Sequence, residues 1–181
     1  LHCRDTLSLH DALPIWKKIT YIPNFVSTEK FYKLSTEKKY IAKKELKIAR
    51  DSFVVLGVGQ IQTRKGVIDF IDIARKMPDV QFVWAGGFSF GGITDGYKEL
   101  KSQMETAPKN ILFTGIVDRD LMNDIYNVSD VLFMPSYNEL FPMSILEAMN
   151  TSTPVLLRDL ELYEDILFEI GRAHVWTPVT R

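Results

Sequence analysis

The amino-acid sequence predicts an α/β domain with a doubly wound, Rossmann-like parallel sheet. Short apolar, β-branched runs alternate with amphipathic stretches from Ser52 onward, as expected for a parallel sheet covered by helices on both faces. The runs are apolar at nearly every position, which indicates strands that are buried on both faces. Five strands are therefore expected, at residues 53–58, 80–85, 111–114, 131–134 and 154–157.

Apolar residues at helical spacing predict the helices between these strands. Three stripes are assigned to the core: Val67, Phe70, Ile71 and Ala74; Leu121, Ile125 and Val128; and Ile145 with Met149. Pro142 marks the start of the last helix, residues 142–150, because the fixed φ of proline suits a first turn and its missing N–H leaves no bond unmade there.

A lysine-rich helix is expected upstream, at residues 36–49. Ile41, Leu46 and Ile48 are available to pack it against the domain. Basic amphipathic helices can lie on anionic membranes. An ordinary solvated surface is the more common case, and it is the interpretation that we favour.

Length and charge narrow the class of protein. The 181 residues are 46% hydrophobic and 25% charged, which fits one globular domain with an ordinary core. A net charge of −1 provides no long-range field, so nucleic acid is not an expected partner. No apolar run approaches the roughly 20 residues that cross a bilayer, and a soluble protein is expected. The single cysteine, Cys3, is compatible with a reducing cytoplasm.

Both ends of the sequence are expected to be non-native. Residues 6–15, TLSLHDALPI, and residues 170–180, IGRAHVWTPVT, resemble translated sequencing-adapter oligonucleotides. We therefore interpret residues 1–15 and 170–181 as non-native segments, and residues 16–169 as a truncated native domain. The three histidines, His2, His10 and His174, lie in the two end segments, so none is considered catalytic.

The segment GVGQIQTRKG, from Gly57 to Gly66, follows a predicted strand and opens a predicted helix. Doubly wound sheets place phosphate-binding amides at this position. Gln62 stands where a dinucleotide fingerprint has its third glycine, and no Ser or Thr follows Gly66 as a Walker loop requires. Nicotinamide, flavin and NTPase sites are therefore disfavoured. Lys65 is a cation at a helix start, where the helix dipole disfavours it unless an anion lies nearby.

Two acids flank the start of the last predicted helix, in the segment PSYNELFPMSILEAMNTSTPV that begins at Pro135. Glu139 lies in the loop before the helix, and Glu147 lies on the helix, eight positions later. Acids in different elements can face one cleft. The amides of the first turn, at residues 141–144, would point into the same cleft and suit a diphosphate.

These motifs together resemble the C-terminal, donor-binding half of the retaining GT-B glycosyltransferases of the glycosyl transferases group 1 family. The resemblance rests on E-x7-E after a strand that ends in Pro-Ser, on the LEAM and T-PV that follow, and on IPNFV, VGQIQTRKG and FTGIV upstream. It implies that the chain binds a nucleotide sugar and that the fold is the C-terminal half of a GT-B fold.

The resemblance also assigns roles to individual residues. Glu139 is implied to bind the donor sugar hydroxyls and Glu147 the ribose hydroxyls, and carboxylates suit both tasks because they accept strong hydrogen bonds. Glu139 and Lys65 are implied as the catalytic residues, with Lys65 neutralising phosphate charge. The remaining implied donor-binding residues are Gly59 and Gln60 after the first strand, Thr114, Gly115, Ile116 and Val117 around the base, and Leu140, Phe141, Pro142, Met143 and Ser144 at the diphosphate.

Three positions depart from the family pattern. Gln60 stands where the family usually has an arginine that assists Lys65, Pro142 replaces a usual glycine, and Ser152 replaces the glycine of the usual G-x-PV turn. Arg64 could supply the missing charge, but we expect Lys65 to face the site and Arg64 to lie outside it.

The resemblance implies further partners and chemistry. Residues 64–86 and 156–168 are similar to bacterial enzymes that glycosylate diacylglycerol, which makes UDP-glucose the expected donor. No Asp-x-Asp pattern offers a metal clamp, so a metal-independent site without a cofactor is expected. The acceptor would bind an N-terminal domain that this chain lacks, so the chain alone is expected to be inactive. The full-length protein is expected in the cytoplasm, where it could contact the inner face of the membrane peripherally.

Two other classes stay open. A GT-B-type epimerase or phosphorylase would share the fold, and a nucleotide-sugar-binding module without transfer activity would share the cleft. Fold alone does not decide among them.

Overall fold

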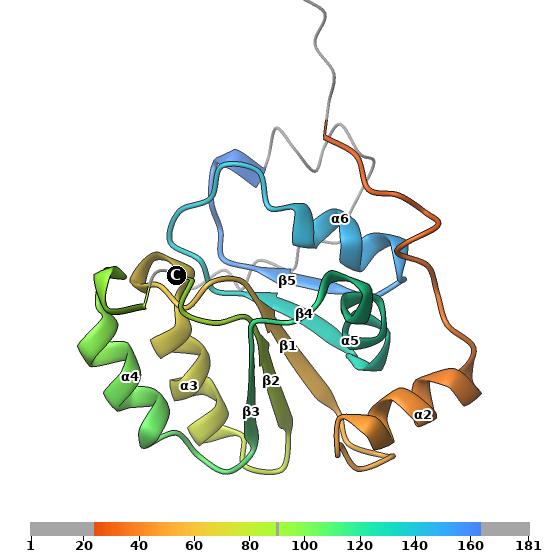
Figure 1. Ribbon diagram of the computed structural model, residues 1–181, viewed down its shortest axis with the longest axis horizontal. Coiled ribbons are helices and arrows are strands. Elements are labelled where there is room, and N and C mark those ends of the chain that lie inside the picture. Colours follow the sequence, from red (N-terminus) through yellow and green to blue (C-terminus); the bar gives the residue numbers. More distant parts are fainter. Residues whose placement is uncertain (1–23, 90, 164–181) are drawn as a thin grey trace, which may run out of the picture.

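The computed structural model describes residues 24–89 and 91–163 of the chain (Figure 1). The predicted non-native segments, residues 1–15 and 170–181, lie outside the described residues. The elements in chain order are α2 (Thr36–Glu45), β1 (Val54–Val58), the 3₁₀ turn η1 (Thr63–Lys65), α3 (Val67–Lys76), β2 (Gln81–Ala85), η2 (Gly91–Ile93), α4 (Tyr97–Glu105), β3 (Ile111–Gly115), η3 (Arg119–Leu121), α5 (Met122–Val128), β4 (Val131–Met134), α6 (Met143–Asn150) and β5 (Val155–Leu157).

The five strands form one parallel sheet in the order β3-β2-β1-β4-β5. Val55 of β1 pairs with Phe82 of β2 on one side and with Val131 of β4 on the other. The chain therefore runs outward from β1 to β3 and then returns to place β4 beside β1. This reversal is a topological switch point, and open parallel sheets bind ligands in the crevice beyond the strand ends there.

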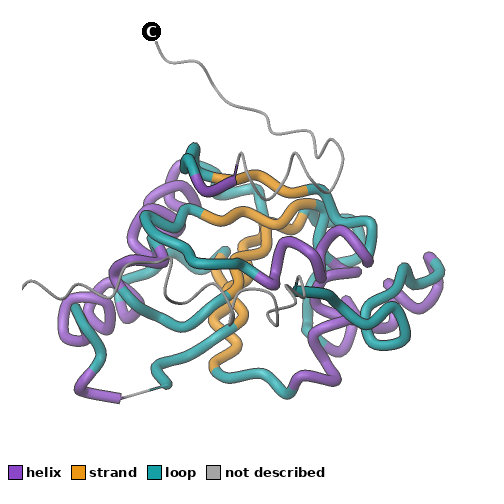
Figure 2. Tube along the Cα trace, turned by 90° about the horizontal axis from the view of Figure 1, so that it is seen from above, coloured by secondary structure: helices purple, strands orange, loops and turns teal. Residues whose placement is uncertain are grey.

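Helices cover both faces of the sheet, as the side and top views show (Figures 1 and 2). The core on one side contains buried residues of α2, α5 and α6, and the core on the other side contains those of α3 and α4. Successive residues of β1 alternate between the two cores, with Val54 and Leu56 in the first and Val55 in the second. The predicted doubly wound parallel sheet of five strands is confirmed. The expected burial holds for β1 and β2, whereas the edge strands β3 and β5 are mostly half-buried.

The lysine-rich helix is shorter than predicted, because α2 ends at Glu45 rather than near residue 49. Lys47 adopts a positive φ of 57°, which interrupts the helix and turns Ile48 into the core, where it is 5% exposed. Leu46 packs against the same core, whereas Ile41 is exposed, so its predicted packing role is wrong.

Two other helix predictions need correction. Leu121 is 55% exposed, because it ends the 3₁₀ turn η3 instead of continuing the buried stripe of α5. Pro142 caps α6 in an extended conformation (φ −77°, ψ 96°), and the helix begins at Met143. Helix α4 had no predicted counterpart.

The segment before α2 is fastened to α5 by two buried asparagines. Asn123 Oδ1 accepts the amide of Tyr32 at 2.9 Å, and Asn127 Oδ1 accepts the amide of Leu34 at 2.8 Å. Asn127 also donates to the carbonyl of Tyr32 at 2.8 Å. Unpaired buried amides are costly, so these bonds fix the path of the segment that precedes the domain.

None of the helices within the described ranges has both the length and the apolar character needed to cross a membrane.

Candidate functional site

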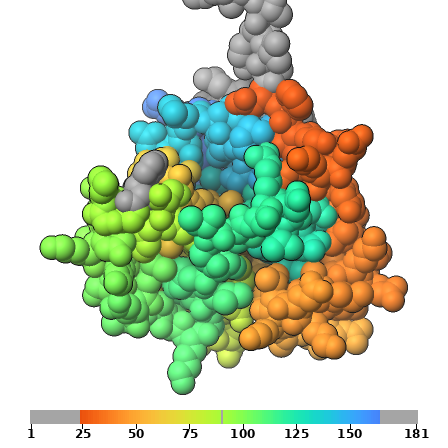
Figure 3. Space-filling model, in the orientation of Figure 1, coloured from red at the N-terminus to blue at the C-terminus, as the bar shows by residue number. Residues whose placement is uncertain are grey.

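Three loops beyond the carboxyl ends of the strands hold most of the predicted site residues. They follow β1 (residues 59–66), β3 (residues 116–121) and β4 (residues 135–142). The first and third belong to adjacent strands on either side of the switch point. In the space-filling view the surface is recessed where these loops approach α6 (Figure 3). All the sequence-predicted site residues except Glu147 lie in these loops or at the ends of the elements beside them.

The switch point is occupied by an ion pair between the two predicted catalytic residues. Lys65 Nζ donates to Glu139 Oε1 at 2.6 Å, and the Lys65 and Glu139 side chains are only 13% and 5% exposed. Lys65 ends η1, and Gly66 follows in the left-handed region at φ 68°. A side chain at Gly66 would overlap the carbonyl oxygen of Pro135, so glycine allows this loop to approach the β4 loop closely.

Arg64 contributes a second cation near Glu139, contrary to the prediction that it lies outside the site. Its guanidinium Nη1 is 3.8 Å from Glu139 Oε2 and donates to the carbonyl of Asn138 at 3.2 Å. Because the Arg64 side chain is half-exposed, water screens this pair more than it screens Lys65. A backbone hydrogen bond also joins the β1 and β4 loops, because the amide of Tyr137 donates to the carbonyl of Arg64 at 2.8 Å.

Gln60, which replaces the usual arginine, is engaged by a neighbouring glutamine. Gln62 Nε2 donates to Gln60 Oε1 at 2.7 Å, and Gln62 Oε1 accepts from Arg64 Nε at 3.0 Å. The two glutamines thus support Arg64 instead of providing a charge. Gly59 lies beneath Lys65, because a Cβ at Gly59 would be 3.4 Å from Lys65 Cε.

Glu147 is held by a different set of partners. The buried hydroxyl of Tyr126 donates to Glu147 Oε2 at 2.7 Å, and Arg119 Nη2 lies 3.7 Å from Glu147 Oε1. The Glu147 side chain is 12% exposed, and Arg119 is 69% exposed. Burial, followed by the negative charge and hydrogen bond of Glu147, raises the pKa of Tyr126 well above its ordinary value. The phenol is therefore a constant proton donor to this carboxylate at neutral pH.

The first turn of α6 lies between the two acids in sequence. Within the described residues, the amides of Met143 and Ser144 have no hydrogen-bond acceptor, whereas Ile145 N–H donates to the Pro142 carbonyl at 3.1 Å. Free amides at a helix start attract anions. Leu140 is 88% exposed and Phe141 is partly buried, so the loop before the turn presents apolar surface to solvent.

The predicted base-binding segment follows β3. Gly115 has φ 71°, and its carbonyl accepts the amide of Gly86 at 3.0 Å, which ties this loop to the end of β2. Ile116 is exposed. Thr114, Ile116 and Val117 help to line a hollow of about 340 Å³, which is also lined by residues in and just after α2 and by residues of η3 and α5.

The structure thus brings Lys65 and Glu139 into contact and places Gly59 beside them. Glu139 and Glu147 share no hydrogen-bond partner among the described residues, so a common cleft for the two acids stays a prediction. Tyr126 and Arg119, the partners of Glu147, were not predicted. A tyrosine inside an apolar stripe could have signalled Tyr126, since a buried phenol needs a hydrogen-bond acceptor.

No group of three or more His, Cys, Asp or Glu side chains that could hold a metal ion occurs in residues 24–89 and 91–163. The metal-independent site remains a prediction.

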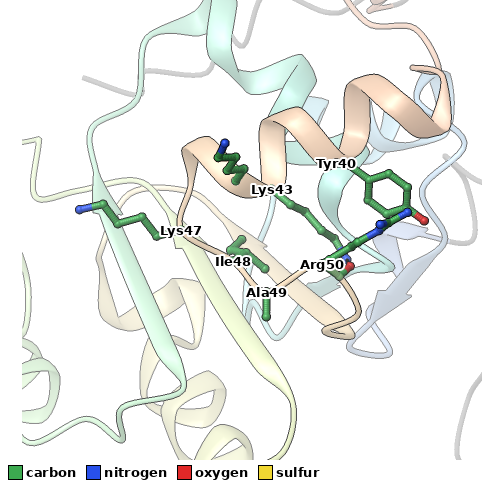
Figure 4. Close-up of a pocket in the computed structure, with 7 residues that line it drawn as sticks. Tyr40, Lys43, Lys47, Ile48, Ala49 and Arg50 are labelled. Carbon is green, nitrogen blue, oxygen red and sulfur yellow. Dashed lines mark hydrogen bonds between the residues drawn. The ribbon is translucent and has the colours of Figure 1, made fainter.

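A second concave surface lies on α2 and the turn that follows it (Figure 4). It is a hollow of about 580 Å³ lined by Tyr40, Lys43, Lys44, Lys47, Ile48, Ala49 and Arg50. The ammonium of Lys43 donates to the carbonyls of Arg50 and Ser52, at 3.2 and 2.8 Å, so it is structural. The guanidinium of Arg50 lies 4.1 Å from the ring centre of Tyr40. This surface is cationic, and no acidic side chain lines it.

The chain is similar in sequence to known proteins. The sequence profile "Glycosyl transferases group 1" matches residues 38–169. The alpha-galactosylglucosyldiacylglycerol synthase of Streptococcus pneumoniae is 50% identical over 151 residues, which cover 83% of this chain and 40% of that protein. The processive diacylglycerol alpha-glucosyltransferase of Acholeplasma laidlawii is 35% identical over 137 residues, covering 76% of this chain and 40% of that protein.

The chain also resembles solved structures in its fold. The crystal structure of Anabaena Alr3699/HepE in complex with UDP and glucose superposes with a TM-score of 0.69 at 24% identity, covering 81% of this chain and 40% of that one. This likeness supports the GT-B fold that the sequence predicted. The chain spans about 40% of the length of the curated relatives it matches. The chain belongs to the glycosyl transferases group 1 family.

Proposed function

We propose that this chain is the donor-binding part of a retaining glycosyltransferase that transfers a hexose from a nucleotide sugar, with UDP-glucose as the donor. The observation that carries the proposal is the nearly buried Lys65–Glu139 pair at the switch point. A buried charge pair is not an efficient way to stabilise a fold. It does place a cation and a hydrogen-bond acceptor side by side, which suits a phosphate linked to a sugar.

The site residues then have separate tasks. Lys65 and the free amides of Met143 and Ser144 carry the diphosphate charge that grows as the glycosidic bond breaks. Glu139 accepts hydrogen bonds from the sugar hydroxyls, and Glu147 accepts those of the ribose. In the transfer step the acceptor oxygen bonds to the anomeric carbon as the bond to the β-phosphate breaks. The acceptor proton moves to the departing phosphate oxygen, so no protein base and no metal is required.

The acceptor is proposed from the relatives. Both relatives named above are diacylglycerol glycosyltransferases, and we propose a diacylglycerol lipid as the acceptor of the full-length protein. An N-terminal domain would bind it, so this chain alone would bind the donor and transfer little. An epimerase or phosphorylase would instead convert the donor without a lipid, and a silent module would bind without any conversion.

Calorimetric titration of the chain with UDP, UDP-glucose, GDP-mannose and NAD, without added metal, tests the donor assignment. We expect preference for the uridine nucleotides. Glu147→Ala should weaken UDP binding by roughly 10- to 100-fold, because it removes charge-assisted hydrogen bonds worth about 1.5–3 kcal/mol. Glu105→Ala, which removes an exposed acid at the end of α4, is the matched control. Equal UDP affinity in the wild type, Glu147→Ala and Glu105→Ala would contradict the role of Glu147, and binding of NAD alone would contradict the donor assignment.

In place of the solvated surface favoured from the sequence, we also propose that the full-length protein contacts an anionic membrane surface through α2 and the turn after it, because exposed lysines gather there. Lys38, Lys44 and Lys47 are exposed there. Burial is the main cause that lowers the pKa of Lys39, with smaller contributions from the cations Lys33 and Lys43, and Asp130 opposes them. Each cation near an anionic bilayer contributes about 1 kcal/mol.

The chain should therefore sediment with phosphatidylglycerol vesicles and not with phosphatidylcholine vesicles. Replacing Lys38, Lys44 and Lys47 with glutamine should lower this binding about 100-fold, while the same change at the lysines at 98, 101 and 109 should not. Binding that ignores both vesicle charge and the α2 variant would refute the contact.

A further inference from the structure

We propose that Tyr126 is a positioning residue that sets the preference of this site for ribonucleotides over deoxyribonucleotides. The inference rests on the proposed function, in which Glu147 binds the ribose hydroxyls. It adds a residue from a different helix, α5, which orients the carboxylate without touching the nucleotide.

Tyr126 is fixed on every side. Its side chain is 0% exposed, and its ring meets Phe31 edge-on with 5.8 Å between ring centres. Its backbone carbonyl accepts the hydroxyl of Thr153 at 2.9 Å, and Thr153 is also bonded to Thr151 at 3.0 Å. The bonds to Thr153 fix the backbone, while full burial and the contact with Phe31 restrict the ring, whose hydroxyl lies 2.7 Å from Glu147 Oε2.

The two oxygens of Glu147 therefore differ in their partners. Oε2 is engaged by the buried phenol, whereas Oε1 faces Arg119, which is 69% exposed. A carboxylate has about four acceptor positions, so one phenol leaves capacity for two ribose hydroxyls. Without Tyr126, the glutamate side chain would lose a fixed rotamer and would have to be ordered each time a nucleotide binds.

Arg119 does not perform this task. A 3.7 Å contact with an arginine side chain that is 69% exposed is weak and easily displaced by a ligand. The phenol cannot leave in the same way, because its departure from the acid would strand a buried hydroxyl. Tyr126 thus holds the carboxylate in both the free and the occupied site, and Arg119 covers Oε1 only until a ribose arrives.

The test is the ratio of the dissociation constants for 2′-deoxy-UDP and UDP, measured by calorimetry on the full chain. The wild type should prefer UDP by about tenfold or more, because a site built to bind a hydroxyl rejects an analogue that lacks it. Tyr126→Phe removes only the hydroxyl and should lower this ratio by about threefold to tenfold. Glu147→Ala should bring the ratio close to one. Tyr40→Phe is the matched control, since it removes an exposed phenol on α2, and it should leave the ratio unchanged.

A thermal unfolding scan accompanies each titration. If Tyr126→Phe lowers the unfolding midpoint and weakens both nucleotides equally, Tyr126 is merely structural and the inference is overturned. A wild-type preference for UDP that disappears in Glu147→Ala but persists in Tyr126→Phe overturns the inference and leaves the proposed function standing. A wild type that does not distinguish the two nucleotides overturns both the role of Tyr126 and the ribose role of Glu147.

Discussion

Replacing Lys65 with methionine is expected to weaken the binding of UDP by about 100-fold, the largest effect of any single side chain in the site. Methionine keeps most of the volume and the apolar stem of lysine, so the change removes mainly the charge. The Lys65 side chain is 13% exposed and its ammonium lies 2.6 Å from Glu139, so little solvent screens its attraction for a diphosphate. Its loss also leaves the carboxylate of Glu139 without its closest cation, and a buried carboxylate repels phosphate.

Calorimetric titration with UDP measures this effect. Arg64 remains 3.8 Å from Glu139 and limits the loss, so the double variant of Lys65→Met with Arg64→Met should bind more weakly than either single variant. Lys109→Met removes an exposed cation from the loop before β3, at the opposite end of the sheet, and should leave the affinity unchanged. If Lys65→Met and Lys109→Met behave alike, the cation of Lys65 does not meet the diphosphate.

The strands were predictable because burial on both faces leaves a nearly continuous apolar run in the sequence. Each predicted strand matches an observed one to within one residue at either end. Helix α4 was missed for the opposite reason. Its sequence, YKELKSQME, has only Leu100 fully buried, and the partly buried Tyr97 and Met104 extend this to a short stripe that is easily overlooked among charged residues. Leu121 was misassigned because a helical period was extended through a 3₁₀ turn, where the side chains rotate differently.

The contact between Lys65 and Glu139 could not be predicted from the sequence. Both residues were recognised as following strands, but their contact requires β1 and β4 to be neighbours. Lys65 and Glu139 are 74 residues apart in the sequence. The spacing of the predicted strands does not indicate that the chain returns to place β4 beside β1. Sheet order is a property of how the helices pack, and it decides which of the strand-end loops share a crevice.

Tyr126 illustrates a different limit of prediction from the sequence. The core stripe predicted for this helix included Ile125 and Val128 but not Tyr126, although Tyr126 is also in the core, where it is 0% exposed. Periodicity says which face of a helix is buried but not what the polar atom of a buried side chain contacts. The acceptor is Glu147, on the next helix, and only the packing of α5 against α6 brings the two together.

Gly86→Ala is expected to destabilise the domain by at least about 4 kcal/mol, which combines backbone strain with overpacking. Gly86 has φ 145°, a conformation that residues with a side chain rarely adopt. A Cβ at this position would also overlap the carbonyl oxygen of Gly59, which accepts the indole N–H of Trp84 at 3.0 Å. Both obstacles are backbone, so no rotamer change relieves them. The unfolding midpoint should fall by about 8–16 °C in a chain of this size.

Differential scanning calorimetry against Gly92→Ala provides the comparison, since a Cβ at Gly92 meets no atom within 4 Å and Gly92 has no positive φ. The effect should extend to binding, because Gly59 lies beneath Lys65 and the amide of Gly59 donates to the carbonyl of Ala85 at 3.0 Å. Pushing Gly59 away from Gly86 would move the ammonium off the switch point, so Gly86→Ala should weaken UDP binding even at temperatures where it remains folded. An unchanged midpoint would mean that the β1 and β2 loops do not touch as described, and that Lys65 is positioned by other contacts.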